Sequence, residues 1–164
     1  MSKKIKFGLS PDEIQRAIDE VNSYKAEFLK KCYELVEALT DEGVKIAKVQ
    51  VAQLDAIDTG ELMNSIQGYY SPTYNVGIIR AGSLHAVFVE FGTGVVGAGQ
   101  PHPNPMPGWN YDSNGHGDKG WVYFDDVRGK FRWTKGFKSR PFMYNTAREL
   151  ERECARIARE VFKR

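Results

Sequence analysis

Two segments in the second half of the chain carry residue types that bind cofactors or metal ions in other proteins. Gly92-Thr-Gly-Val-Val-Gly97 has the glycine spacing of a dinucleotide-binding turn, but that chemistry needs the third glycine to open a helix that meets the pyrophosphate. Ala98-Gly-Gln-Pro101 follows instead, so we expect a flexible loop and no cofactor. Asp112-Ser-Asn-Gly-His-Gly117 resembles the first half of a calcium loop, yet its twelfth position is Tyr123. We expect an Asx-rich turn there and no metal.

Histidines and cysteines are the remaining candidates for catalysis or metal binding. His102 and His116 lie in the same Gly/Pro-rich region, whereas Cys32 and Cys154 fall on the apolar stripes of two predicted helices, so the sequence offers no complete zinc ligand set. No motif frames a serine or cysteine as a nucleophile. We therefore expect a protein without catalytic activity; a small hydrolase that uses His102 or His116 is an alternative hypothesis.

The segment from Arg128 to Arg140 is the stretch whose residues best suit phosphates and nucleic-acid bases. Phe131, Trp133 and Phe137 lie between its cations, which are Arg128, Lys130, Arg132, Lys135, Lys138 and Arg140. Alternation along a hairpin would put cations on one face and aromatic rings on the other, as in any half-buried strand. We favour a protein interface here, and contact with nucleic acid stays open as the alternative.

Composition restricts the class of protein. The chain has 164 residues, and its 23 Lys plus Arg against 21 Asp plus Glu give a net charge of +2, too small for nucleic-acid binding through overall charge. The uncharged stretch at residues 62–79 contains glycines and a proline, so no membrane span is predicted. The N-terminus lacks an apolar signal region, and two cysteines make no disulfide framework, so we expect a cytoplasmic protein.

A long amphipathic helix is predicted from Ser10 onward, because Ser10-Pro-Asp-Glu13 combines an N-cap hydroxyl, a proline at the first helical position and a capping-box glutamate. Its stripe, spaced alternately by four and three residues, contains Ile14, Ile18, Val21, Lys25, Phe28, Cys32, Leu35 and Leu39. Beyond Gly43 the stripe resumes one residue out of phase, which predicts a kink or break near Gly43. A continuous helix to Ile57 would be about 70 Å long, so it must bend or project.

The sequence between residues 58 and 134 predicts one short helix and four strands. Asp58-Thr-Gly-Glu61 repeats the capping pattern ahead of a short second helix. Two antiparallel strands are predicted at residues 66–70 and 75–80. Residues 120–124 and 130–134 are rich in aromatic and β-branched side chains and predict a β-hairpin at the edge of the same sheet.

The remaining segments surround a long loop. Residues 84–91 form an apolar run that fits either a buried strand or a buried helical turn; in it we expect His85 to be structural and Glu90 to be a helix-terminal or ion-paired acid. Residues 92–120 predict a long excursion that is functional or mobile. Ser139-Arg-Pro141 opens a final helix with the stripe Met143, Ala147, Leu150, Cys154, Ile157 and Val161.

These elements predict an α+β fold in one domain, residues 1–164, with an insert at about residues 94–138. A small antiparallel sheet packs against a long N-terminal helix, kinked near Gly43, and a C-terminal helix. Both striped helices are expected on one face of the sheet, because neither stripe is stable in water. The insert combines the Gly/Pro-rich loop with the β-hairpin.

Three separated segments resemble the tail-component family of long-tailed bacteriophages, the head-to-tail joining or tail-completion proteins. The segments are Asp58-Thr-Gly-Glu-Leu-Met-Asn-Ser-Ile66, His85-Ala-Val-Phe-Val-Glu-Phe-Gly-Thr93 and Ser139-Arg-Pro-Phe-Met-Tyr-Asn-Thr-Ala147, in the order that the family shows. The resemblance covers residues 14–162 and rests on the combination, since each motif alone is weak. Compact members lack an insert between the second and third motifs, so the role of this insert is not inherited.

The resemblance implies a noncatalytic virion-assembly protein from a phage or prophage. Such a protein forms a ring with itself, a hexamer, between the capsid connector or head-closure protein and the tail-terminator or tail-tube protein. It would be found in the host cytoplasm during assembly and then at the head-tail interface of the virion. The residues expected at its protein interfaces are Phe91, Thr93, Arg128, Lys130, Arg132, Trp133 and Phe137. A DNA-contacting accessory protein that uses residues 128–140 is the alternative.

Overall fold

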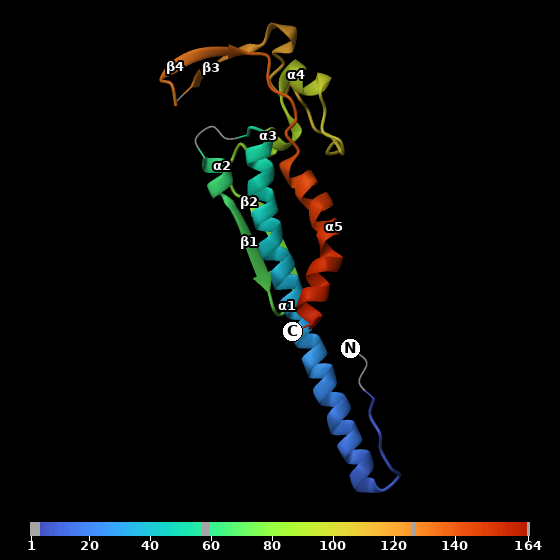
Figure 1. The fold of residues 1–164 in the computed structure, drawn as a ribbon. Helices are drawn as coiled ribbons and strands as arrows, with labels where there is room; N and C mark the ends of the chain where they lie inside the picture. Colours follow the sequence, from blue (N-terminus) through green and yellow to red (C-terminus); the bar gives the residue numbers. More distant parts are fainter. Residues whose placement is uncertain (1–3, 57–59, 126, 164) are drawn as a thin grey trace.

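The computed structural model describes residues 4–56, 60–125 and 127–163, which form an elongated α+β molecule built around one long helix (Figure 1). The class is the one that the sequence predicts. In chain order the elements are α1 Pro11–Gln53, α2 Glu61–Asn64, β1 Ile66–Ser71, β2 Val76–Ala81, α3 Ala86–Phe91, α4 Gly94–Gly99, the 3-10 helix η1 Gly117–Lys119, β3 Trp121–Asp125, β4 Lys130–Thr134 and α5 Phe142–Lys163.

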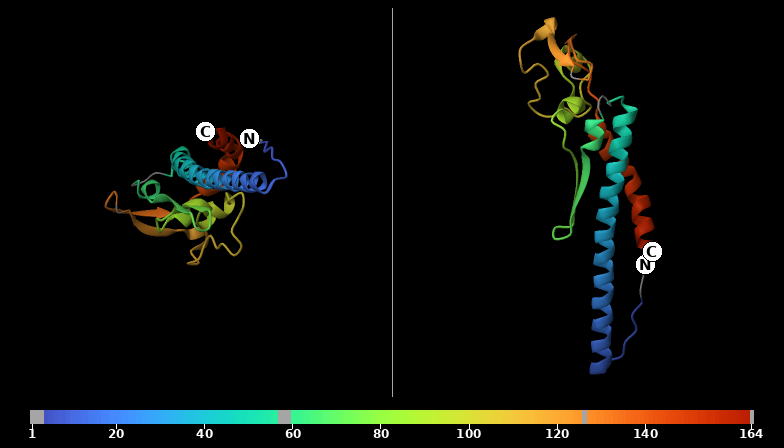
Figure 2. Two further views of the ribbon diagram at one scale, coloured as in Figure 1. Left: turned by 90° about the horizontal axis from the view of Figure 1, so that it is seen from below. Right: turned by 90° about the vertical axis from the view of Figure 1, so that its left-hand side faces the viewer.

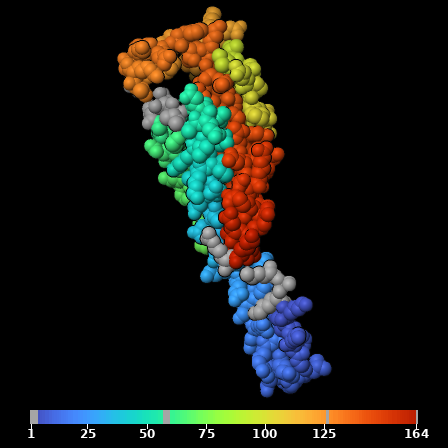
Figure 3. All heavy atoms as spheres, in the orientation of Figure 1, coloured from blue at the N-terminus to red at the C-terminus, as the bar shows by residue number. Residues whose placement is uncertain are grey.

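Helix α1 begins with the predicted capping box. The Ser10 hydroxyl accepts a hydrogen bond from the Glu13 backbone N–H at 3.4 Å, and the Glu13 carboxylate accepts one from the Ser10 N–H at 3.3 Å. With 43 residues, α1 is about 65 Å long at 1.5 Å per residue. Its N-terminal part projects beyond the rest of the molecule, as the space-filling view shows (Figure 3). Of the two expected outcomes for so long a helix, projection is the one observed.

The predicted kink near Gly43 is wrong, because α1 continues through this residue. Gly43 is buried where α1 comes closest to its neighbours: an added Cβ would collide with Ile79 of β2 and lie 3.3 Å from Leu150 of α5. This close packing offsets the helix-propensity cost of glycine. The shift of the apolar stripe by one residue beyond Gly43 is also compatible with a straight helix. A strict 3.5-residue repeat drifts around a helix of 3.6 residues per turn, so a shift by one residue returns the apolar positions to the inward face.

Helix α1 lies between the β1–β2 hairpin and α5, which differs from the predicted arrangement of both helices on one face of a sheet (Figure 2). Helix α5 runs along α1 from Gln50, which bonds Glu149 and Asn145 at 2.9 and 3.1 Å, to Phe28, whose ring centroid is 5.7 Å from that of Phe162. A sheet of two strands, which lie about 5 Å apart, is wide enough to cover only one helix of about 10 Å diameter. Helix α5 therefore packs on α1 and not on the hairpin.

The two predicted hairpins are both present, but they form separate two-stranded sheets. The strands β1 and β2 match the prediction to within one residue, with Ile66 opposite Ala81. The β3–β4 hairpin was expected at the edge of the same sheet, and that expectation is wrong. The chain reaches it after α3 and α4, which carry it to the far end of the molecule (Figure 1). The apolar run that fitted a strand or a helical turn is α3.

The core lies around the C-terminal half of α1. Its buried apolar side chains are Ala47, Val51, Ala56, Leu62, Ile66, Ala86, Val89 and Phe142. They come from α1, α2, β1, α3 and α5 and, for Ala56, from the segment that follows α1, so one cluster ties these elements together. The capping residues Asp58 and Thr59 predicted ahead of α2 lie outside the described residues. Within the described chain, every helix is too short or too polar to cross a bilayer.

The β1–β2 hairpin approaches α1 closely at Gly77, so a substitution at this residue tests the packing of the hairpin on the helix. Substitution Gly77→Ala adds a Cβ that would collide with Thr40 Oγ1 and lie 3.4 Å from Val36. We expect a loss of about 1–3 kcal/mol in the free energy of unfolding, measured by chemical denaturation. The control is Gly99→Ala, where a Cβ has nothing within 4 Å. Equal stability of Gly77→Ala and the wild type would contradict the close approach.

Candidate functional site

The candidate site residues lie at the end of the molecule where α1 finishes, on α3, the loop after it and the β3–β4 hairpin (Figure 1). Thr93 and Phe137 form a backbone bridge, with Thr93 N–H donating to Phe137 O at 3.0 Å and Phe137 N–H donating to Thr93 O at 3.1 Å. The bridge joins the two ends of the insert. The structure therefore places these two predicted interface residues at the base of the insert, in contact with each other.

The predicted interface residue Phe91 is half-buried in an aromatic cluster. Its ring centroid is 4.7 Å from that of His102 and 5.2 Å from that of Trp109. The Trp109 indole N–H also donates to Gly92 O at 3.3 Å. These contacts fasten the Gly/Pro-rich loop to α3, so the loop that was expected to be functional or mobile is packed along this part of its length.

Glu90 is buried at the junction of three segments. Its carboxylate accepts hydrogen bonds from the backbone N–H groups of Met143 and Tyr144, each at 2.9 Å, and lies 3.0 Å from His102 Nε2. Two otherwise unpaired amides in the first turn of α5 are thereby satisfied by a side chain from α3. The Ser139 hydroxyl donates to Glu90 O at 2.6 Å in the same junction. Glu90 is thus a helix-terminal acid that is hydrogen-bonded to His102, and helix-terminal is one of the two roles expected from the sequence.

The three histidines lie in three different environments. His102 is buried against Glu90, whereas His116 stacks on Trp121 at a ring separation of 5.2 Å. His85 Nδ1 lies 2.8 Å from the hydroxyl of Ser83, which donates to Glu61 at 3.0 Å. A serine between the histidine and the carboxylate differs from a catalytic relay, in which the histidine is in the middle. Among the described residues, no three His, Cys, Asp or Glu side chains lie together where they could share a metal ion.

The glycine-rich segment is helical, which corrects the expected loop. Helix α4 begins at Gly94 and encloses Gly97, so the third glycine lies inside a helix and does not open one. A Cβ at Gly97 would lie 2.9 Å from the Gly92 backbone and 3.0 Å from Tyr111. These glycines therefore allow close packing.

The calcium-like segment forms the expected Asx turn. The Asp112 carboxylate accepts hydrogen bonds from the backbone N–H groups of His116 at 2.8 Å and Gly117 at 2.6 Å. The Gly117 and His116 amides together lower the pKa of Asp112 below its ordinary value. Its oxygens are committed to the turn, as in a structural Asx motif.

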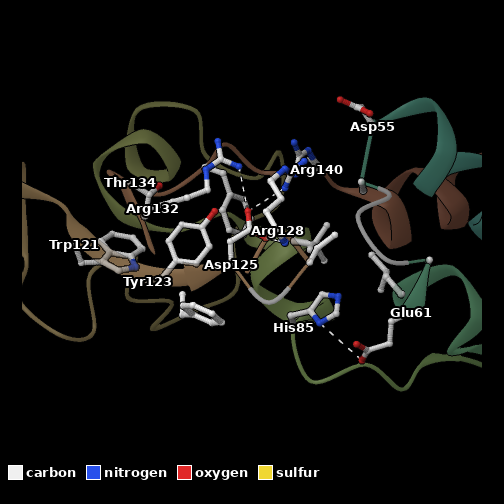
Figure 4. Close-up of a pocket in the computed structure, with 17 residues that line it drawn as sticks. Asp55, Glu61, His85, Trp121, Tyr123, Asp125, Arg128, Arg132, Thr134 and Arg140 are labelled. Carbon is white, nitrogen blue, oxygen red and sulfur yellow. Dashed lines mark hydrogen bonds and ion pairs between the residues drawn. The ribbon is translucent and has the colours of Figure 1, made fainter. Parts of the chain in front are cut away.

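The cationic face of the β3–β4 hairpin turns toward the rest of the molecule. Asp125 is buried, and it accepts hydrogen bonds from Arg128 Nη1 at 3.0 Å and Arg132 Nη1 at 3.3 Å (Figure 4). Burial by itself raises the pKa of Asp125, but the hydrogen bonds from Arg128 and then Arg132 outweigh it and leave the pKa below its ordinary value. Two of the cations proposed to meet a partner are thus bound to a carboxylate of the same hairpin.

A cavity of about 710 Å³ separates this face from α2 and α3 (Figure 4). Its charged lining residues have both signs: Arg128, Arg132 and Arg140 together with Asp55, Glu61 and Asp125. His85 also lines it, on the side of Glu61. Balanced charge does not select an anionic ligand, and the Ser83–His85 geometry does not activate a nucleophile. We therefore assign no chemistry to this cavity.

The opposite face of the hairpin is apolar and exposed. Cross-strand pairing sets Val122 opposite Trp133 and Phe124 opposite Phe131, which puts all four side chains on one face. Their exposed fractions are 61%, 59%, 48% and 74% in that order. We call these four residues the hairpin face. It holds one residue from the predicted interface, Trp133; the other three were missed, although strand alternation was a signal that could have found them.

The other predicted residues of the basic segment lie around this face. Lys130 is exposed at the start of β4. Lys135 stands 5.8 Å from the centre of the Trp133 ring, and Arg140 stands 5.8 Å from that of Phe137. Both are cation–π contacts within the chain. The basic segment is therefore divided between a cationic inner side and an aromatic outer side.

Comparison with known proteins adds no relative: no family model, no curated protein and no solved structure matches this chain.

The hydrogen bonds at the Glu90 junction predict that one substitution there lowers the stability of the protein strongly. We expect Glu90→Ala to lower the free energy of unfolding by about 3 kcal/mol or more, because two backbone N–H groups and His102 lose a buried partner. Chemical denaturation measures the loss. The control is Glu151→Ala, which removes an exposed pair with Arg148 and is worth at most about 0.5 kcal/mol. Similar effects of the two substitutions would contradict the capping role.

The lowered pKa of Asp125 predicts a pH dependence with a definite sign. A carboxyl whose folded pKa is depressed stabilises the folded state above its unfolded pKa of about 3.9, and this contribution is lost as the pH falls through the folded value. We expect the stability difference between the wild type and Asp125→Asn to shrink as the pH is lowered below about 4. Denaturation at several pH values measures this difference, and a difference independent of pH would contradict the ion pairing.

Proposed function

We propose that this chain is a noncatalytic structural subunit that joins head to tail during the assembly of a long-tailed bacteriophage. The observation that carries the proposal is the exposed hairpin face, because a contiguous apolar patch on a projecting hairpin is typical of a protein–protein interface. Aromatic residues supply much of the binding energy of such surfaces. An assembly subunit needs surfaces of this kind and no reactive centre.

The positions of the three family-like motifs support the assignment. The second and third motifs meet at the Glu90 junction, where Arg140 N–H also donates to Val89 O at 2.9 Å. The described part of the first motif contributes the buried residues Leu62 and Ile66 to the core. A set of motifs that builds a common core and a helix cap is in keeping with a structural family resemblance.

In the proposed assembly each subunit contacts its neighbours in a ring of six between the head-closure or connector protein and the tail-terminator or tail-tube protein. A ring needs a heterologous contact, in which one surface of a subunit meets a different surface of the next. The hairpin face would supply one side of that contact. The expected locations are the host cytoplasm during assembly and the head-tail interface afterwards.

The alternative, a DNA-contacting accessory protein, gains less support from the side-chain arrangement. Arg128 and Arg132 bind Asp125, and Lys135 and Arg140 cover aromatic rings of the same chain. Binding to DNA that weakens steeply with salt would favour this alternative over the assembly role.

Removal of aromatic rings from the hairpin face tests the proposal. We expect the double variant Phe131→Ala, Trp133→Ala to remain folded in isolation, because both side chains are exposed. In a phage that lacks the wild-type gene, the variant should lower the yield of infectious particles by at least about tenfold. Electron microscopy should then show separate heads and tails. Arg132 is a poorer target, because its reversal would also disturb Asp125.

The matched control is Tyr74→Ala at the turn of the other hairpin, where the ring is 79% exposed. This variant should complement the phage like the wild type. A normal yield from the double variant would refute the role of the hairpin face.

A further inference from the structure

The projecting part of α1 carries a second exposed apolar surface. Ile14, Ile18, Val21 and Phe28 have exposed fractions of 40%, 48%, 51% and 48%. They remain exposed although residues 4–10 run beside this part of the helix (Figure 1). A helix segment of five turns gains most of its stability from packing of its apolar face. This surface, which we call the α1 stripe, therefore needs a partner outside the described fold.

The spacing of the α1 stripe is that of a coiled coil. Ile14, Ile18, Val21, Lys25 and Phe28 alternate by four and three residues, which is the a/d pattern of a heptad repeat. In that pattern Lys25 occupies an a position. A single lysine at an a position costs stability but selects the orientation and number of helices. The pattern favours a helix as the occupant of this face.

The α1 stripe continues a seam that is already filled within the chain. Above Phe28, α1 packs along α5, and α5 ends at Lys163 next to the contact between Phe28 and Phe162. From Phe28 toward the N-terminus, the same row of residues continues along α1 for the 18 residues from Pro11 to Phe28, a length of about 27 Å. A second helix of this length would begin where α5 stops.

We propose that the α1 stripe pairs with the same segment of a second copy of this chain, as an antiparallel two-helix coiled coil. Antiparallel overlap of residues 11–28 brings Ile18 of one copy opposite Val21 of the other. It also sets each Lys25 opposite Ile14 of the partner, three residues from the end of the overlap, so the two lysines lie in separate layers and each ammonium group reaches solvent. Parallel pairing would put the two Lys25 side chains in one layer, where they repel each other.

This pairing does not rest on the proposed phage function, because it follows from α1 alone. Its symmetry also differs from that of a ring. An antiparallel pair is isologous and closes with two copies, whereas the ring contact is heterologous. The α1 stripe would therefore link two subunits through one end of the molecule and leave the hairpin face at the other end free.

Analytical ultracentrifugation of the full chain tests the pairing. We expect a concentration-dependent monomer–dimer equilibrium. Ile18→Glu should raise the dissociation constant at least about a hundredfold, since one substitution enters the symmetric interface twice. Lys25→Leu should lower the constant about tenfold, because it completes the apolar seam. The matched control is Ser23→Glu, which places the same charge on the far side of the helix and should leave the constant within about threefold.

Ile18→Glu should keep the near-ultraviolet circular dichroism of the folded core, because residue 18 lies outside it, while the projecting segment of α1 loses helicity together with its partner. A chain that stays monomeric up to about 1 mM would overturn the proposal, as it would assign the α1 stripe to a different protein. A dimer insensitive to both Ile18→Glu and Lys25→Leu would also overturn it.

Pulsed electron paramagnetic resonance tests the orientation. A spin label is attached at Asn22→Cys or at Lys30→Cys in a chain that also carries Cys32→Ser and Cys154→Ser. In the antiparallel pair, label positions are offset along the axis by about 8 Å at residue 22 and by about 32 Å at residue 30. We expect the interspin distance at residue 30 to be much the longer. Similar distances at the two positions would indicate parallel helices and overturn the antiparallel assignment.

Discussion

The buried carboxylate of Glu90 is the interaction on which the arrangement of this end of the molecule depends. A charge in the protein interior is stable only with several hydrogen-bond partners, and here they come from the first turn of α5 and from His102 of the Pro-rich loop. These partners determine where α5 begins and hold the loop against α3. Because α5 then runs along α1, the same contact sets the direction of the long seam between the two helices.

Two apolar surfaces remain outside that packed centre, at opposite ends of an elongated molecule (Figures 1 and 3). The hairpin face points outward, and its charged side turns inward to Asp125. The α1 stripe extends past the end of α5. In the proposals above, contacts with other chains would cover both surfaces.

The two surfaces have different consequences for symmetry. Self-pairing through α1 closes with two copies, while a contact between the hairpin face and a different surface of a neighbour continues around a ring. Both kinds of contact can coexist because they use opposite ends of the molecule. The basic residues between Arg128 and Arg140 contribute to these surfaces mainly by holding the hairpin together, through Asp125 and through contacts with aromatic rings.

The local elements were largely determined by the sequence. The capping box at Ser10, the two hairpins and the α+β class follow from caps, turns and periodicity, whose free energies depend on neighbouring residues. Only the tertiary structure decided that α1 passes straight through Gly43, since the contacts there come from β2 and α5. The Glu90 cap joins residues 53 positions apart. Which hairpin face is exposed was likewise undetermined, because alternation defines two faces and packing decides which of them is covered.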